Sequence, residues 1–168
     1  MKQKTIFLFS AIFFIFLSQE IIAEELQEKF HDWSVFKTDR GDQTICYLIS
    51  TPIKQDYNFN KRGEPFFLLV YSPNEADEIS VSSGFYYDKK SDVEISFPLK
   101  KFYLFPYDSL AWANDKNEDI EITKEMQKQE SFVVTGIAKD GRISRDTYSL
   151  IGFITAHKKI REFCKSLS

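Results

Sequence analysis

The 168-residue chain has few of the residues that build metal and redox centres. It contains two histidines and two cysteines, and neither type clusters in the sequence. His31 and His157 have no companion at metal-ligand spacing, so the sequence predicts no zinc site and no cofactor. Cys46 and Cys164 lie far from the Cys-x-x-Cys spacing, which argues against a redox-active pair.

Signatures of hydrolases and of calcium loops are missing too. No Gly-x-Ser-x-Gly motif occurs, and Ser83-Gly84 is better explained as strand and β-bulge. Three residues match the first, third and fifth ligands of a calcium loop: Asp115, Asn117 and Asp119. However, Ile120 and Met126 stand where that loop needs Gly and Glu. We therefore predict no enzymatic activity, with a hydrolase site assembled only in the fold as the alternative.

Blocks of basic residues and long apolar segments are absent after residue 23. The net charge is −3, and Lys and Arg are scattered among Asp and Glu, which does not support a nucleic-acid partner. No apolar segment within 24–168 approaches the roughly 20 residues that span a bilayer, so we expect no transmembrane segment there.

The first 23 residues have the pattern of a secretory signal peptide. Lys2 and Lys4 precede an apolar run of about 12 residues, Ile6–Leu17, and Ala23 offers a small residue for cleavage. A membrane anchor is the alternative, but the run is shorter than a bilayer span. We predict that residues 1–23 are removed and that residues 24–168 form a single domain.

Export would place both cysteines in an oxidising compartment. The pattern then predicts a Cys46–Cys164 disulfide, with two free buried thiols as the alternative. The predicted location is periplasmic, outer-membrane-associated or secreted. No Cys follows the apolar run, which argues against a lipid anchor and modestly favours the periplasm.

Short alternating or apolar segments predict strands at 33–37, 43–50, 66–71, 78–87, 93–97, 102–107, 111–112, 131–138 and 143–150. Polar residues 51–65 are expected to form a loop, and 120–129 a short helix. Phe153, Ala156, Ile160 and Phe163 recur at helical spacing, which predicts an amphipathic C-terminal helix. The predicted fold is mainly β: a single-domain β-sandwich or partly open barrel with two helices.

Aromatic residues are dense in the middle of the chain. Most should fill the core, but the segment 102–107 carries aromatics on both faces of one strand. We therefore predict that some of Tyr103, Tyr107 and Trp112 lie outside the core and form an amphipathic patch for a glycan, a peptide or a partner protein.

Charged residues beside predicted strands give two weaker candidates. Arg62 and Glu64 border a buried strand, which fits a structural ion pair or a surface that faces a partner. Arg142 and Arg145 lie near Asp146, where a surface ion pair is expected and an acidic ligand is the alternative.

Several segments, in order, resemble one family of exported bacterial proteins. They are Asp32-Trp33-Ser34-Val35, Cys46-Tyr47-Leu48, Arg62-Gly63-Glu64-Pro65-Phe66, Leu104-Phe105, Ala111-Trp112, Val133-Val134-Thr135-Gly136 and Asp146-Thr147-Tyr148-Ser149-Leu150-Ile151-Gly152-Phe153, followed by Cys164. Together they are similar to the invasion-associated locus B family, and the Asp-Thr-Tyr-Ser-Leu-x-Gly-Phe segment is the most specific. The resemblance implies a β-sandwich of the periplasm or envelope with no known enzymatic activity and with two matching cysteines. Tyr148 is expected to be a buried ring with an anchored hydroxyl.

These observations predict a non-enzymatic exported protein that binds an envelope protein, a host protein or a cell-surface component. The family is named for a role in host-cell invasion, so the resemblance also implies host interaction. The alternatives are a periplasmic hydrolase and a glycan-binding sandwich.

Overall fold

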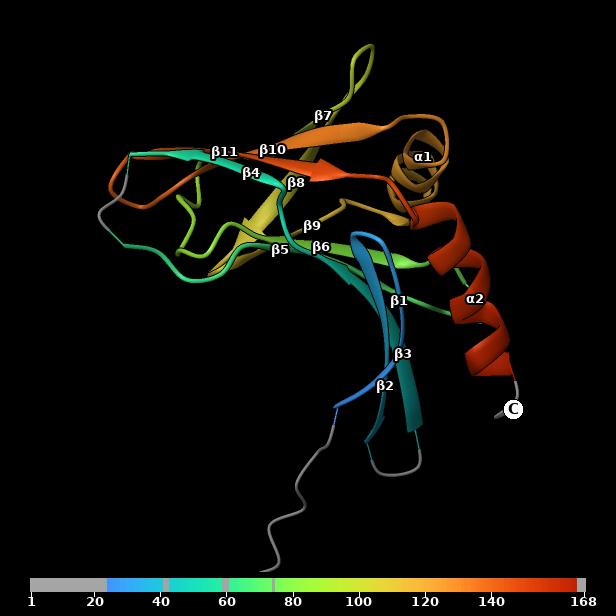
Figure 1. Ribbon diagram of the computed structural model, residues 1–168. Helices are drawn as coiled ribbons and strands as arrows, with labels where there is room; N and C mark the ends of the chain where they lie inside the picture. Colours follow the sequence, from blue (N-terminus) through green and yellow to red (C-terminus); the bar gives the residue numbers. More distant parts are fainter. Residues whose placement is uncertain (1–23, 41–42, 59–60, 74, 166–168) are drawn as a thin grey trace, which may run out of the picture.

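The structure is a computed structural model that describes residues 24–40, 43–58, 61–73 and 75–165 (Figure 1). The predicted signal peptide, residues 1–23, lies outside the described residues. In chain order the elements are β1 Glu24–Phe30, β2 Trp33–Arg40, β3 Gln43–Ser50, β4 Lys54–Tyr57, β5 Phe66–Val70, β6 Glu78–Ser82, β7 Val93–Ser96, β8 Lys101–Tyr107, β9 Leu110–Trp112, α1 Lys116–Met126, β10 Ser131–Ile137, β11 Ile143–Ser149 and α2 Phe153–Lys165.

The strands form one continuous antiparallel sheet that folds over on itself. Its order is β1-β2-β3-β5-β6-β9-β8-β7-β10-β11-β4, and β8 pairs with β9 on one side and β7 on the other. Figure 1 shows β10, β11 and β4 as one layer above β5 and β6, while β1–β3 extend away from the body. The sheet does not close, because β1 and β4 are both edge strands. The prediction of an open β-sandwich with two helices is confirmed.

An aromatic cluster joins the two layers. Phe67 packs against Trp33 at 5.9 Å and against Phe132 at 5.0 Å between ring centroids, and Phe132 stacks on Tyr148 at 5.2 Å. Each of these rings is buried. Trp33 Nε1 also donates a hydrogen bond to the carbonyl of Ser149, 116 residues away. Residues from both ends of the chain therefore share one core.

Tyr148 differs from the prediction in one respect. Its ring is buried as expected, but its hydroxyl has no hydrogen-bond partner among the described residues. Burial raises the pKa of this hydroxyl well above its ordinary value. The predicted anchored hydroxyl is therefore wrong, and the ring contributes through packing.

Helix α1 begins four residues earlier than the predicted helix at 120–129. The Asp115 side chain accepts hydrogen bonds from the backbone N–H groups of Asn117 and Glu118, which caps the helix at its N-terminus. The spacing that resembled a calcium loop is thus a helix cap and a first turn that includes Asp119.

Two edge strands were not predicted, and one predicted strand is too long. β1 was missed because its charged sequence lacks a clear alternation, and β4 lies inside the predicted loop 51–65. The strand predicted at 78–87 ends at Ser82. Gly84, predicted as a β-bulge, lies beyond the end of the strand with a φ of 75°, a left-handed conformation that favours glycine.

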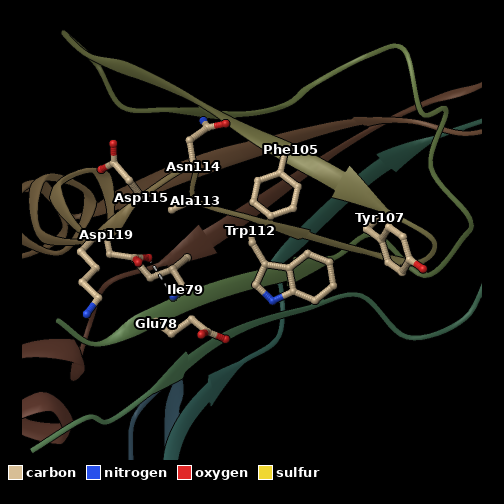
Figure 2. Close-up of a pocket in the computed structure, with 10 residues that line it drawn as sticks. Glu78, Ile79, Phe105, Tyr107, Trp112, Ala113, Asn114, Asp115 and Asp119 are labelled. Carbon is tan, nitrogen blue, oxygen red and sulfur yellow. Dashed lines mark hydrogen bonds between the residues drawn. The ribbon is translucent and has the colours of Figure 1, made fainter. Parts of the chain in front are cut away.

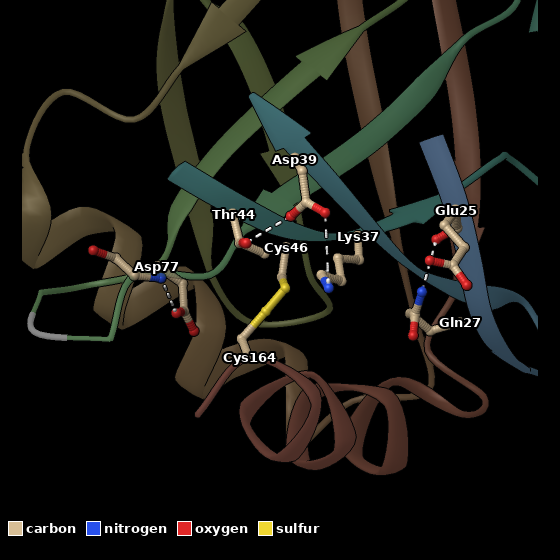
Figure 3. Close-up of a disulfide and its surroundings, with 9 residues drawn as sticks. Glu25, Gln27, Lys37, Asp39, Thr44, Cys46, Asp77 and Cys164 are labelled. Carbon is tan, nitrogen blue, oxygen red and sulfur yellow. Dashed lines mark hydrogen bonds and ion pairs between the residues drawn. A yellow bond between two sulfur atoms is a disulfide. The ribbon is translucent and has the colours of Figure 1, made fainter. Parts of the chain in front are cut away.

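The predicted disulfide is confirmed. Cys46 on β3 is joined to Cys164 on α2, across 118 residues of sequence (Figure 3). Helix α2 buries Phe153, Ala156 and Ile160, as its amphipathic pattern predicts, and it contacts β1, β2 and β3. Neither α1 nor α2, nor any other helical part of the described residues, is long and apolar enough to cross a membrane.

Candidate functional site

The outer face of β8 and β9 carries exposed aromatic side chains. Alternate residues of β8 point outward, and Tyr103, Phe105 and Tyr107 are 48 %, 44 % and 63 % exposed. Phe105 lies directly opposite Trp112 of β9, and their rings stack at 5.9 Å with an interplanar angle of 27°. The residues predicted as a patch therefore lie on the surface, with Trp112 half-buried.

These rings form one wall of a surface hollow of about 530 Å³, which we call the acidic–aromatic hollow. It is lined by Phe105, Tyr107 and Trp112 together with three carboxylates, those of Glu78, Asp115 and Asp119. Figure 2 shows the aromatic rings at one end and the two aspartates at the other, with Glu78 beneath Trp112. Strands β6, β8 and β9 and the start of α1 thus all contribute to the hollow.

Asp119 is the most perturbed of the carboxylates. Its Oδ1 accepts a hydrogen bond of 2.9 Å from the backbone N–H of Ile79, and its side chain is largely buried. Burial, followed by the nearby charges of Glu78, Glu118 and Asp115, raises its pKa from 3.8 to about 6. Three carboxylates and one lysine, Lys116, thus line the hollow.

Tyr103 shares the outward face of β8 but does not line this hollow. It contributes to a neighbouring hollow together with Glu94, Lys101 and Arg145. The predicted patch is thus divided: Tyr107 and Trp112 meet in one hollow, and Tyr103 lies beside another.

Arg62 and Glu64 have separate environments. The Arg62 guanidinium makes a buried, two-point ion pair with Asp146 and also donates to Gln55 of β4. Glu64 is exposed. Arg62 therefore joins β4 to β11 from the interior, and it is not a partner-facing residue.

Because Asp146 pairs with Arg62, it is not the ion-pair partner of the arginines in the β10–β11 hairpin. Arg142 pairs with Asp140 across the turn, whereas Arg145 is exposed. The expected surface ion pair at this hairpin therefore forms within the turn itself.

The two histidines occupy different environments. His31 is exposed in the turn between β1 and β2, where it has a φ of 52°. His157 on α2 is buried, with Nε2 2.6 Å from Asp77 Oδ2, and Arg161 lies 3.3 Å from the same oxygen. Among the described residues, no hydroxyl or thiol is hydrogen-bonded to His157. Thr123 of α1 lines the same surface hollow as His157 and Asp77, and its buried hydroxyl has no hydrogen-bond partner among the described residues. The pair therefore has no nucleophile hydrogen-bonded to it.

Within the described part of the chain, no group of three or more His, Cys, Asp or Glu side chains is arranged to hold a metal ion. The acidic–aromatic hollow instead offers flat aromatic faces next to carboxylate acceptors. Such a surface suits recognition of a flat or positively charged group.

Of the aromatic and carboxylate residues that line the hollow, sequence reasoning predicted Tyr107 and Trp112 and missed Glu78, Phe105, Asp115 and Asp119. The alternation of β8 could have assigned Phe105 to the same face as Tyr103 and Tyr107. Glu78 and Asp119 come from other elements, and no sequence signal brings them to Trp112.

Among the comparisons with known proteins, one solved structure has a similar fold. No protein-family model matches the chain, and no curated protein matches it. The crystal structure of invasion associated protein B from Bartonella henselae is similar, with a TM-score of 0.60, 14 % identity, and coverage of 84 % of this chain and 99 % of that chain. At this identity the likeness concerns the fold alone, so the chain has a fold similar to that of an invasion associated protein.

Proposed function

We propose that this chain is an exported, non-enzymatic protein of the cell envelope that binds a partner through the acidic–aromatic hollow. The observation that carries the proposal is the exposure of Phe105 and Tyr107 beside Trp112 in one concave site. Aromatic residues are typical anchors of binding surfaces, because they offer a large contact area at a small entropic cost. The partner is an envelope protein, a host protein or a cell-surface component.

Export is supported by the signal-like sequence of residues 1–23 and by a disulfide that requires an oxidising compartment. The similar crystal structure is of a protein named for invasion. For this chain we propose a location in the cell envelope. Fractionation of the native cell and determination of the mature N-terminus test this part: an intact Met1 in the cytoplasmic fraction would contradict it.

Site-specific photo-cross-linking tests the binding site. A benzophenone amino acid at Tyr107 is expected to form a covalent adduct with the partner in the native cell. The matched control is the same amino acid at Tyr86, which is 61 % exposed but does not line the hollow. Trp112→Ala should remove the adduct at position 107. Equal adducts at both positions, or none at either, would refute this binding site.

The mass of the adduct also separates a protein partner from a glycan. A hydrolase centred on His157 and Asp77 is the competing hypothesis, and among the described residues no hydroxyl or thiol is hydrogen-bonded to His157. A hydrolytic activity that His157→Gln abolishes, while the fold is retained, would favour the hydrolase.

A further inference from the structure

We propose that the acidic–aromatic hollow binds the side chain of an arginine presented by a partner polypeptide. This inference rests on the proposed function and names the chemistry of the partner. It depends on three properties of the hollow: free aromatic faces, an excess of carboxylates, and a preponderance of hydrogen-bond acceptors.

The aromatic wall leaves faces free for a planar cation. Phe105 and Trp112 lie side by side on neighbouring strands with nearly parallel rings. Tyr107 already has Lys89 Nζ at 5.8 Å from its ring centroid. Phe105 and Trp112 stack on each other, which uses one face of each ring, and no described cation lies over either of them. A guanidinium stacks well on such rings, and tryptophan is the strongest aromatic partner of a cation.

The carboxylates of the hollow are not neutralised by the described residues that line it. Glu78 forms no ion pair with a described residue, and Asp119 uses Oδ1 for the Ile79 N–H, which leaves Oδ2 for a ligand. Lys116 is the cation among the lining residues, and its Nζ lies 2.6 Å from Glu75. A positively charged ligand would therefore form favourable ion pairs with the carboxylates of the hollow.

Acceptors also outnumber donors in the hollow. The carboxylates of Glu78, Asp115 and Asp119 supply six acceptor oxygens. The amide N–H₂ of Asn114 is already used, since it donates to the carbonyl of Tyr103 and to Glu118. The remaining donors of the lining are the Trp112 indole N–H, the Tyr107 hydroxyl and the ion-paired Lys116. Arginine has five N–H donors and no acceptor, whereas a sugar needs both donors and acceptors from its site. Lysine offers a compact, strongly hydrated charge that stacks less well on flat rings. The hollow therefore favours arginine over lysine and over a glycan.

The fluorescence of Trp112 provides a direct test with short probe peptides. Acetyl-Gly-Arg-Gly-amide is titrated into the intact mature protein, with the citrulline and lysine peptides and neutral oligosaccharides as comparisons. Trp33 is buried in the core and is expected to give a constant background. The arginine peptide should change the emission in a saturable manner, and the uncharged citrulline peptide should bind roughly tenfold more weakly.

Variants of the hollow provide the controls. Glu78→Gln should weaken arginine binding, whereas Glu162→Gln, which removes an exposed carboxylate of α2, should leave it unchanged. Trp112→Phe should keep an aromatic face but abolish the emission change, so binding by this variant is followed by calorimetry. Equal binding of the arginine and citrulline peptides, or saturable binding of a sugar alone, would overturn the inference.

The outcomes also separate this inference from the proposed function. If no peptide binds while the Tyr107 adduct in cells persists and depends on Trp112, arginine recognition is refuted and the binding site stands. If the arginine peptide binds and no cellular adduct forms, the chemistry of the hollow is supported and its cellular role is refuted.

Discussion

Arg62 and Asp146 form an ion pair in which neither side chain is open to solvent. Nη1 lies 2.8 Å from Oδ2 and Nη2 lies 2.6 Å from Oδ1, and the two side chains are 3 % and 0 % exposed. The guanidinium also lies over the Tyr57 ring at 4.2 Å. One side chain thus connects β4, β11 and the segment before β5.

Removal of Arg62 should destabilise the fold, because it would leave the Asp146 carboxylate buried without a partner. We expect Arg62→Met to lower the free energy of unfolding by about 3–5 kcal/mol. The matched control is Arg142→Met, which removes an exposed arginine paired with Asp140 and should lower the free energy of unfolding far less, because solvent screens this pair. Urea denaturation followed by circular dichroism measures both, and equal losses would contradict the structural role of Arg62.

The disulfide should contribute much of the stability, because it closes a loop across 118 residues. In the chain-entropy model, reduction should lower the free energy of unfolding by roughly 4–5 kcal/mol. Reductant should shift the urea midpoint of the native protein but not that of a Cys46→Ala/Cys164→Ala variant. Thiol titration of the denatured, unreduced protein should detect no free thiol; two free thiols would disprove the bridge.

Asp119 should make stability depend on pH. Its folded-state pKa of about 6 lies above the ordinary value of 3.8, so the folded state binds a proton more readily than the unfolded state between these pH values. This carboxyl therefore destabilises the fold above about pH 6, and that penalty disappears as the pH falls through 6 toward 4.

Asp119→Asn keeps an acceptor for the Ile79 N–H and removes the charge. We expect this variant to be more stable than the native protein at pH 7.5 and to lose that advantage near pH 4. Urea denaturation at the two pH values checks the sign. A stability difference that is the same at both would refute the shifted titration of Asp119.

Gly84 should tolerate no side chain, because it combines a positive φ with a close backbone neighbour. A β carbon there would overlap the carbonyl of Gly63, whose N–H is itself 2.8 Å from the Gly84 carbonyl. Gly141 has a similar φ of 82° but open space around it, so it is the matched control.

Gly141→Ala should cost about 1–2 kcal/mol from backbone strain alone. Gly84→Ala should cost a further ~1–3 kcal/mol from overpacking. Thermal denaturation of the two variants distinguishes these effects, and equal midpoints would show that the Gly63 contact can relax.

Most of the central fold was predictable because its strands bury apolar residues in a regular pattern. Phe67 and Leu69 of β5, and Val134 of β10, are all buried, and each lies in a predicted strand. The edge strands were not predictable in this way. All four residues of β4 are exposed, so no hydrophobic period marks it, and its position depends on Arg62 from another segment.

The candidate site was predictable only in part. The aromatic density around Tyr107 and Trp112 indicated a patch, because one strand cannot bury both of its faces in a two-layer fold. Glu78 and Asp119 belong to elements whose meeting depends on tertiary packing. The partner of Arg62 was missed for the same reason, since Asp146 is 84 residues away.

The covalent link between β3 and α2 has a mechanical consequence. When the two ends of the chain are pulled apart, force passes directly from Cys46 to Cys164, and the segment between them cannot lengthen. Of the described elements, only β1, β2 and the start of β3 at the N-terminal side, and the last residue of α2 at the other end, lie outside this segment and can unravel. The acidic–aromatic hollow lies wholly within the shielded segment, so it would keep its shape under tension that strips away the outer strands.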